Sequence, residues 1–275
     1  MKTTFHSLLA LFLLLGLSAC GPAGSDDSDD NVSSCCDINA SSCCDIDANE
    51  SCCDVEDENA TGGADLDDNG SRANESSLSW VPLLDSGKLD GGWVLTDFAG
   101  KGEVSFDENG SLVLGMGVEL TGVHLPDLGD LPVMDYEIAL SAKRAQGGDF
   151  FCGLTFPYGE SNATLVLGGW GGALVGISSL DDFDASENDT GDVYAFEENH
   201  WYDVRLRVTK AKMEAWIGDK KIIDCDVEGR KVSMRPGEVE MSAPLGICTY
   251  ATSGVIRNFR IRKLNPDEIP TNPQP

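Results

Sequence analysis

The chain has 275 residues and a formal net charge of −28 at pH 7, with 47 acidic residues against 19 lysines and arginines. This length allows one or two domains, and the acidic excess is uneven, since 16 acidic residues and one basic residue, Arg72, lie between Gly21 and Ser79. From Trp80 onward 31 acidic and 17 basic residues remain, with no Lys/Arg cluster wide enough to follow a phosphate backbone, so we expect no nucleic-acid partner.

A short apolar run, Leu8 to Leu17, follows Lys2 near the N-terminus. It is about ten residues long, which is too short to cross a bilayer and typical of the core of a signal peptide. The run ends in Leu-Ser-Ala before Cys20, which resembles the lipobox of bacterial lipoproteins, where the cysteine receives diacylglycerol. We therefore predict a lipoprotein signal peptide over residues 1–19 and lipidation of Cys20. The alternative is a plain secretory signal with an incidental cysteine.

The lipid determines the expected location of the protein. A multi-chain lipid on one cysteine anchors a protein stably, and the sequence contains no other segment that reads as a transmembrane span. Gly21 follows the cysteine, whereas an aspartate there is the usual retention cue for the inner membrane in enteric bacteria. We expect an exported protein anchored to a membrane of the bacterial cell envelope, with the outer membrane favoured.

Residues 20–79 form an acidic stretch with almost no aromatic and few large aliphatic side chains. Such a stretch buries too little apolar surface to offset the entropy of ordering, so we predict a disordered tether. A degenerate repeat runs through it as Ser34-Cys35-Cys36-Asp37, Ser42-Cys43-Cys44-Asp45 and Ser51-Cys52-Cys53-Asp54. These cysteines suit adventitious disulfides or a soft metal, although adjacent cysteines do not have the usual spacing of a zinc site.

Residues 80–264 contain short apolar or alternating segments bounded by Gly, Asp, Asn and Pro, a pattern typical of strands and turns. We expect no convincing helix. Strands are expected at 104–106, 111–116, 136–145, 150–156, 163–167, 174–178, 201–209, 212–217, 220–226, 245–249 and 255–263. Gly218-Asp219 suits the positive φ of a tight hairpin turn between two of them. So many strands in one unit predict an all-β sandwich of two sheets, followed by a Pro-rich tail at 265–275.

The same segment resembles a known family. Residues 80–85 and 89–93 look like the opening of the 3-keto-disaccharide hydrolase family, and residues 200–205, 214–219 and 256–264 are similar to its closing strands. The order of these motifs along the chain gives the resemblance. It implies a concanavalin-like jelly roll, the fold shared by legume lectins, laminin-G domains and many glycan hydrolases.

The middle of this domain holds the candidate ligand-binding residues. Trp170 has a glycine pair on each side, so no neighbouring side chain hides it, and an exposed indole face stacks well on a sugar ring. We therefore predict that the domain recognises carbohydrate through Trp170, with Asp149, Glu187 and Asn188 as hydrogen-bonding residues. The alternatives are that Trp170 fills the sandwich interior beside a glycine bulge, and that the acidic turn is a solvated loop.

Glycoside cleavage generally needs two carboxyl groups at a set separation. The catalytic candidates are Asp149, Asp184 and Glu187. The family resemblance implies a glutamate in the strand after the Gly-rich segment, but the corresponding residues 164–170 contain no carboxylate. Hydrolysis of 3-keto-disaccharides or related sugars is therefore the alternative to sugar binding without turnover. A non-catalytic module that contacts other envelope proteins is the third candidate function.

No cofactor or metal site is expected from the sequence. A helix-flanked calcium loop that starts at Asp182 needs glycine where Glu187 stands and glutamate where Val193 stands. Calcium bound in another way by a lectin-like loop stays open.

The histidines and the remaining cysteines of the domain match no catalytic pattern. His124 and His200 lie far apart and fit no zinc or triad spacing, so we expect structural roles. Cys152, Cys225 and Cys248 form an odd set, for which one disulfide and buried free thiols fit the sequence equally well.

Overall fold

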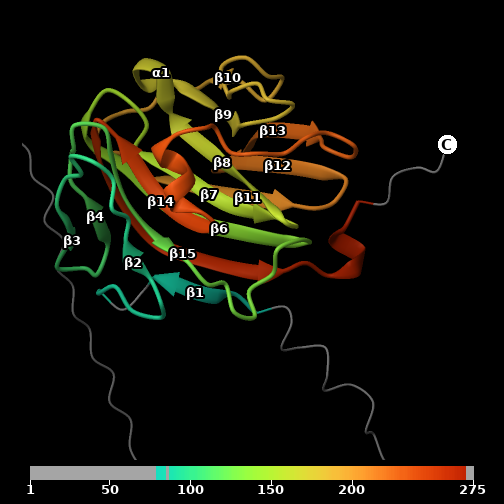
Figure 1. Ribbon diagram of the computed structural model, residues 1–275, viewed down its shortest axis with the longest axis horizontal. Helices are drawn as coiled ribbons and strands as arrows, with labels where there is room; N and C mark the ends of the chain where they lie inside the picture. The colour runs from blue at the N-terminus through green and yellow to red at the C-terminus, as the bar shows by residue number, and fades with distance from the viewer. Residues whose placement is uncertain (1–78, 85–86, 271–275) are drawn as a thin grey trace, which may run out of the picture. The chain divides into compact units, whose positions relative to one another are not determined.

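A computed structural model describes residues 79–84 and 87–270 of the chain (Figure 1). The predicted signal peptide, Cys20, the acidic tether with its cysteine repeats and the last five residues lie outside this part. The described domain is a sandwich of two antiparallel sheets, so the predicted all-β, concanavalin-like jelly roll is confirmed. Within these two ranges, none of the helices is long and apolar enough to pass through a bilayer.

The first sheet contains eight strands of the described chain. Its two longest strands, β6 and β15, lie side by side at its centre (Figure 1). In spatial order the strands are β13 (Lys220–Asp226), β12 (Lys212–Ile217), β11 (Tyr202–Val208), β6 (Tyr136–Gly147), β15 (Thr252–Lys263), β4 (Leu112–Leu114) and β3 (Val104–Phe106), and β1 (Val81–Leu84) pairs with β15.

The second sheet contains seven strands of the described chain. In spatial order they are β10 (Asp192–Val193), β9 (Leu174–Ser178), β8 (Ser161–Gly168), β7 (Cys152–Tyr158), β14 (Leu245–Tyr250), β5 (Leu120–Leu125) and β2 (Val94–Leu95). Alternate residues of each strand point to opposite faces, so the inner faces of both sheets bury their apolar side chains in one core. Leu154 and Phe156 of β7 and Ile138 and Leu140 of β6 belong to this core.

All eleven predicted strands are present, and their ends differ from the prediction by at most three residues. The sequence pattern missed four strands, of which β5 is the most important because it lies inside the second sheet. Gly122 makes this segment look like a turn. It is a glycine because a Cβ there would lie 2.5 Å from the carbonyl oxygen of Ile247 on β14.

The described chain also contains three short helical turns, none of them predicted, of which two connect strands and one follows the last strand. They are α1 (Gly169–Gly172), η1 (Glu238–Ser242) and η2 (Pro266–Glu268). The first is not a regular α-helix, because Trp170 has φ 48° and ψ 55°, in the left-handed region. In Figure 1 this turn lies beside β9 at one end of the second sheet.

Candidate functional site

A pocket of about 410 Å³ lies on the outer face of the second sheet. Its floor follows from strand alternation, because Leu165 and Leu167 of β8 enter the core while Thr164 and Val166 point outward and line the pocket. Thr164 is paired in register with Ser178 of β9, so two hydroxyl groups lie next to each other on this floor. The strand register therefore supplies a floor of short side chains, two of which carry hydroxyl groups.

Residues 235–242, which include η1 and are called the crossing segment below, cross the outer face and form one wall of the pocket. Ser242 ties this segment to the sheet, since its Oγ lies 2.7 Å from Oγ1 of Thr155. Val239 packs against a small apolar cluster on the same face, which includes Leu120 and Phe150. The crossing segment thus closes the face over β5 and β14 and leaves the pocket beside it.

Trp170 lies at the rim of the pocket with 45% of its surface exposed. The alternative in which Trp170 fills the interior is therefore wrong. Its turn is held from below by Arg144, whose Nη2 donates to the carbonyl oxygens of Gly172 at 2.7 Å and of Gly168 at 3.3 Å. A Cβ at Gly168 would lie 2.4 Å from that nitrogen, so this glycine, two residues before the tryptophan, makes room for the buried guanidinium.

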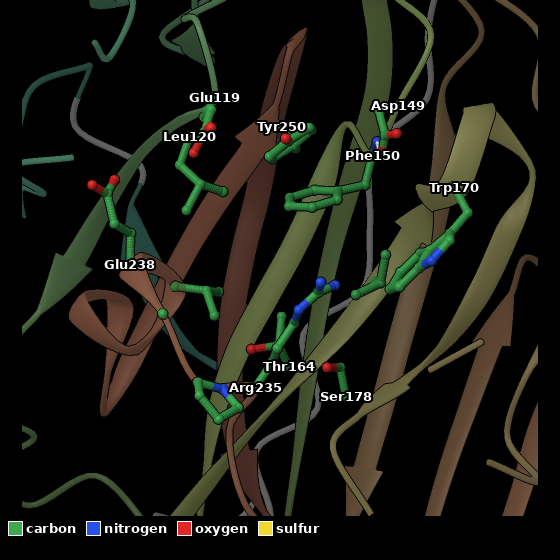
Figure 2. Close-up of a pocket in the computed structure, with 14 residues that line it drawn as sticks. Glu119, Leu120, Asp149, Phe150, Thr164, Trp170, Ser178, Arg235, Glu238 and Tyr250 are labelled. Carbon is green, nitrogen blue, oxygen red and sulfur yellow. Dashed lines mark hydrogen bonds between the residues drawn. The ribbon is translucent and has the colours of Figure 1, made fainter. Parts of the chain in front are cut away.

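A cation extends over the floor from the crossing segment. Nη1 of Arg235 lies 2.7 Å from Oδ2 of Asp184, and the guanidinium lies 5.7 Å from the ring centre of Trp170. Figure 2 shows the Arg235 side chain extending towards Trp170. Oδ1 of Asp184 accepts hydrogen bonds from Ser178 Oγ at 2.5 Å and from the Ala185 amide at 2.7 Å. Asp184 is therefore mostly covered and holds the arginine, with no carboxylate oxygen left without a partner.

The structure brings some of the predicted site residues together and separates others. Asp149 and Trp170 both line the pocket, and Asp184 lies behind Arg235. Glu187 is exposed but does not line the pocket. Asn188 is committed to its own loop, because its amide nitrogen donates to three backbone carbonyl oxygens and its Oδ1 accepts from a threonine amide and hydroxyl.

Several pocket residues were not predicted from the sequence. Glu119, Tyr250, Arg235 and Glu238 line the pocket and come from three separate parts of the chain. In Figure 2 the Glu119 and Glu238 carboxylates lie at the side of the pocket away from Trp170. No spacing pattern marks them, since only the sheet pairing and the crossing segment bring them together.

His124 and His200, the two histidines in the part of the chain that the structure describes, pack in structural surroundings. Over residues 79–84 and 87–270, no group of three His, Cys, Asp or Glu side chains is placed to hold an ion. Nδ1 of His124 lies 2.9 Å from Oγ1 of Thr96, and partial burial lowers the pKa of this histidine. The ring of His200 packs against Tyr202 with 4.7 Å between centres.

The three cysteines of the domain are free and buried, so the disulfide alternative is wrong for them. Burial raises the pKa of the Cys248 thiol to about 12 and that of Cys152 even higher. These thiols are therefore protonated and unreactive at neutral pH.

The chain is similar in structure to several solved proteins at low sequence identity. No protein-family model matches the chain, and no curated protein matches it, so the resemblance to 3-keto-disaccharide hydrolases stays a prediction. Among solved structures, the carbohydrate-binding module CBM66 from Bacillus subtilis is similar, with 12% identity, a TM-score of 0.41 and coverage of 62% of this chain and 96% of that one. A Bacillus subtilis protein of unknown function with a galectin-like fold shares 12% identity at a TM-score of 0.43, over 62% of this chain and 89% of that one. The apo Crh5 transglycosylase shares 11% identity at a TM-score of 0.46, over 69% and 85%.

Proposed function

We propose that the pocket on the outer face of the second sheet binds a carbohydrate. The observation that carries the proposal is the position of Trp170, which is held at the rim with 45% of its surface exposed. Tyr250 lines the same pocket and is 37% exposed. A sugar ring presents apolar C–H groups on its faces, and aromatic side chains at the edge of a hollow suit such a ligand.

The polar groups of the pocket suit the hydroxyl groups of a sugar. Arg235 offers N–H donors and Glu119 offers an acceptor carboxylate, whereas the Ser178 hydroxyl donates to Asp184 and the Thr164 hydroxyl is bonded to Thr155. The volume of about 410 Å³ is roughly fourteen times the share of one water molecule in the liquid, which accommodates one sugar ring with its substituents. The proposed ligand is therefore a single sugar unit, free or at a chain terminus.

Hydrolysis of 3-keto-disaccharides or related sugars is the second candidate function. Three carboxylates, those of Glu119, Asp149 and Glu238, line the pocket, and glycoside cleavage generally requires two. Asp149 accepts hydrogen bonds from the amides of Phe150 at 2.8 Å and Gly171 at 3.3 Å, which support the Trp170 turn. Glu119 is the carboxylate most available to a ligand, since it is exposed and makes no side-chain hydrogen bond within the described residues.

A panel of mono- and oligosaccharides, including 3-keto-disaccharides, tests both functions when binding and released monosaccharide are followed together. We expect Trp170→Ala to abolish detectable binding, whereas Phe183→Ala, which removes an aromatic side chain that is 56% exposed outside the pocket, retains it. Turnover that is lost in Glu119→Gln while binding remains indicates the hydrolase. Absence of both binding and turnover refutes both sugar functions and leaves the protein-interaction module.

We further propose that the chain is an exported lipoprotein anchored through Cys20, with the outer membrane as the favoured location. The apolar run and the Leu-Ser-Ala-Cys segment support this proposal. The mass of the mature N-terminal peptide and membrane fractionation of wild type, Cys20→Ser and the control Cys35→Ser test it. We expect only Cys20→Ser to lose the lipid mass and the membrane association. An unmodified N-terminus in the wild type contradicts the anchor.

A further inference from the structure

We propose that the outer face of the first sheet is a second binding surface, which takes an anionic polysaccharide whose sugars carry carboxylate groups. This face belongs to the other sheet from the pocket and is defined by six basic side chains. They are Lys143 of β6, Arg205 and Arg207 of β11, and Arg257, Arg260 and Arg262 of β15. Their strand neighbours, such as Leu206 and Ile261, are buried in the core, so the basic side chains point outward.

Half of these cations form no ion pair within the described residues, although the charge of Lys143 is felt by Asp107. Glu137, with 1% of its side chain exposed, lies 2.8 Å from Nη1 of Arg205 and 3.6 Å from Nη2 of Arg207, and it also contacts Arg262. By contrast, Lys143, Arg257 and Arg260 form no ion pair within residues 79–84 and 87–270. Uncompensated cations gathered on one face of a chain with net charge −28 indicate an anionic partner.

Tryptophans hold the unpaired cations in place. The Arg257 guanidinium lies 3.9 Å from the ring centre of Trp201, and Nζ of Lys143 lies 4.9 Å from the same centre. The Arg260 guanidinium lies 4.9 Å from the ring centre of Trp80. Such stacking leaves the edge N–H groups of an arginine free while it restricts the side chain, so less entropy is lost when a carboxylate binds.

The strand register sets the spacing of these cations. Arg260, Ala139 and Arg205 are paired side by side on three adjacent strands, which places the two arginine backbones roughly 10 Å apart with a small residue between them. In the next outward row Arg257, Ser141 and Asp203 are paired side by side, and Oδ1 of Asp203 accepts a hydrogen bond from Ser141 Oγ at 2.6 Å. The face therefore presents guanidinium groups at intervals between short side chains, which suits an extended polymer with carboxylates at intervals along a hydroxyl-rich chain.

Other polyanions fit this face less well. A membrane surface is disfavoured because, of the large apolar side chains exposed in the described chain, only Val81 belongs to a strand of the first sheet. Single-stranded nucleic acid needs free aromatic faces for its bases, but cations already stack on Trp80 and Trp201. An acidic peptide strand that adds to a sheet needs a sheet edge, whereas these cations lie on the face.

Retention of the full-length protein on immobilised polygalacturonate tests the proposal, with its methyl ester as the uncharged polymer of the same backbone. The surface variant is Lys143→Gln/Arg257→Gln/Arg260→Gln. The matched control, Lys101→Gln/Lys210→Gln/Lys231→Gln, removes the same charge outside this face. We expect the wild type and the control to bind polygalacturonate but not the ester. The surface variant is expected to bind about eightfold more weakly or worse, because each of the three exposed contacts contributes a factor of roughly two to five.

Three results overturn the proposal. The first is equal weakening in both triple variants, which indicates net charge alone. The second is loss of polymer binding in Trp170→Ala with retention in the surface variant, which assigns the polymer to the pocket. The third is binding of polyglutamate or single-stranded DNA as tight as binding of polygalacturonate, which removes the preference for a sugar backbone. A thermal transition unchanged among the variants keeps loss of binding distinct from loss of folding.

Discussion

Asp184 fixes Arg235 over the floor of the pocket through an ion pair of 2.7 Å. The carboxylate is itself fixed by Ser178, which belongs to that floor, so the floor and the crossing segment share one network. Asp184 therefore acts as a positioning residue for Arg235, although the sequence suggested it as a catalytic carboxylate.

Asp184→Asn is expected to weaken binding of the pocket ligand by a factor of about three to ten, because the neutral amide no longer holds the guanidinium in place. Arg235→Gln is expected to weaken binding by a similar factor. The double variant is expected to weaken binding little more than either single variant does. Titration calorimetry of the four proteins measures the coupling. Fully additive losses contradict the positioning role.

Glu137 is the buried anion on which the first sheet's arginines converge, with 1% of its side chain exposed. Glu137→Gln is expected to lower the free energy of unfolding by about 3–5 kcal/mol, because removing one partner leaves guanidinium groups without their buried counter-charge. Urea unfolding at pH 7 measures this loss. The control Glu160→Gln, at an exposed site, is expected to change stability by less than about 0.5 kcal/mol.

Glu268 supplies a pH-dependent contribution to stability. The hydrogen bond from Arg262 is the main reason that the pKa of Glu268 falls to about 2 from its ordinary value of 4.5. A depressed folded-state pKa means that this contribution is complete above pH 4.5 and is lost as the pH falls towards 2. We expect Glu268→Gln to cost about 1.5–3 kcal/mol at pH 7 and almost nothing at pH 2, as measured by urea unfolding across this range. A difference between the two proteins that does not depend on pH contradicts this account.

The strands were predictable because their signal is local. Alternation in residues such as 204–208 reports one buried face directly, and the structure places β11 there. Strand β5 was missed because Gly122 is typical of a turn. The close approach of β14 explains why this position is a glycine. The pocket was predictable only at Asp149 and Trp170, since Arg235 and Glu119 reach it through tertiary contacts.

The basic face of the first sheet was also not predictable from the sequence, because sheet pairing assembles it. Read along the chain, β15 shows a short basic run that includes Arg257, Arg260 and Arg262, but Lys143 and Arg205 lie more than fifty residues away from it. The pairing of β6 with both β11 and β15 brings them onto adjacent strands. Charge clusters that depend on sheet order are therefore invisible to a search for basic runs.

Arg144 supports the Trp170 turn from inside the sandwich, where it is 6% exposed and its guanidinium lies 5.2 Å from the ring centre of Phe151. Its Nε has no hydrogen-bond partner among the described residues, and burial lowers its pKa, so the side chain is kept at an energetic cost. We expect Arg144→Lys to retain the charge, but its ammonium group to donate to only one of the two carbonyl oxygens, those of Gly168 and Gly172, that Nη2 of the arginine reaches together, which lets the tryptophan move.

The predicted result for Arg144→Lys is a loss of sugar affinity of about tenfold with a loss of stability of about 1–2 kcal/mol, since one buried carbonyl group loses its donor. Quenching of tryptophan fluorescence by acrylamide, compared with the same change in a Trp170→Phe background, reports whether Trp170 becomes more accessible. The control Arg230→Lys, at a salt-bridged arginine outside the pocket, is expected to leave both affinity and quenching unchanged. Unchanged affinity in Arg144→Lys contradicts the view that the buried guanidinium holds the tryptophan in its binding position.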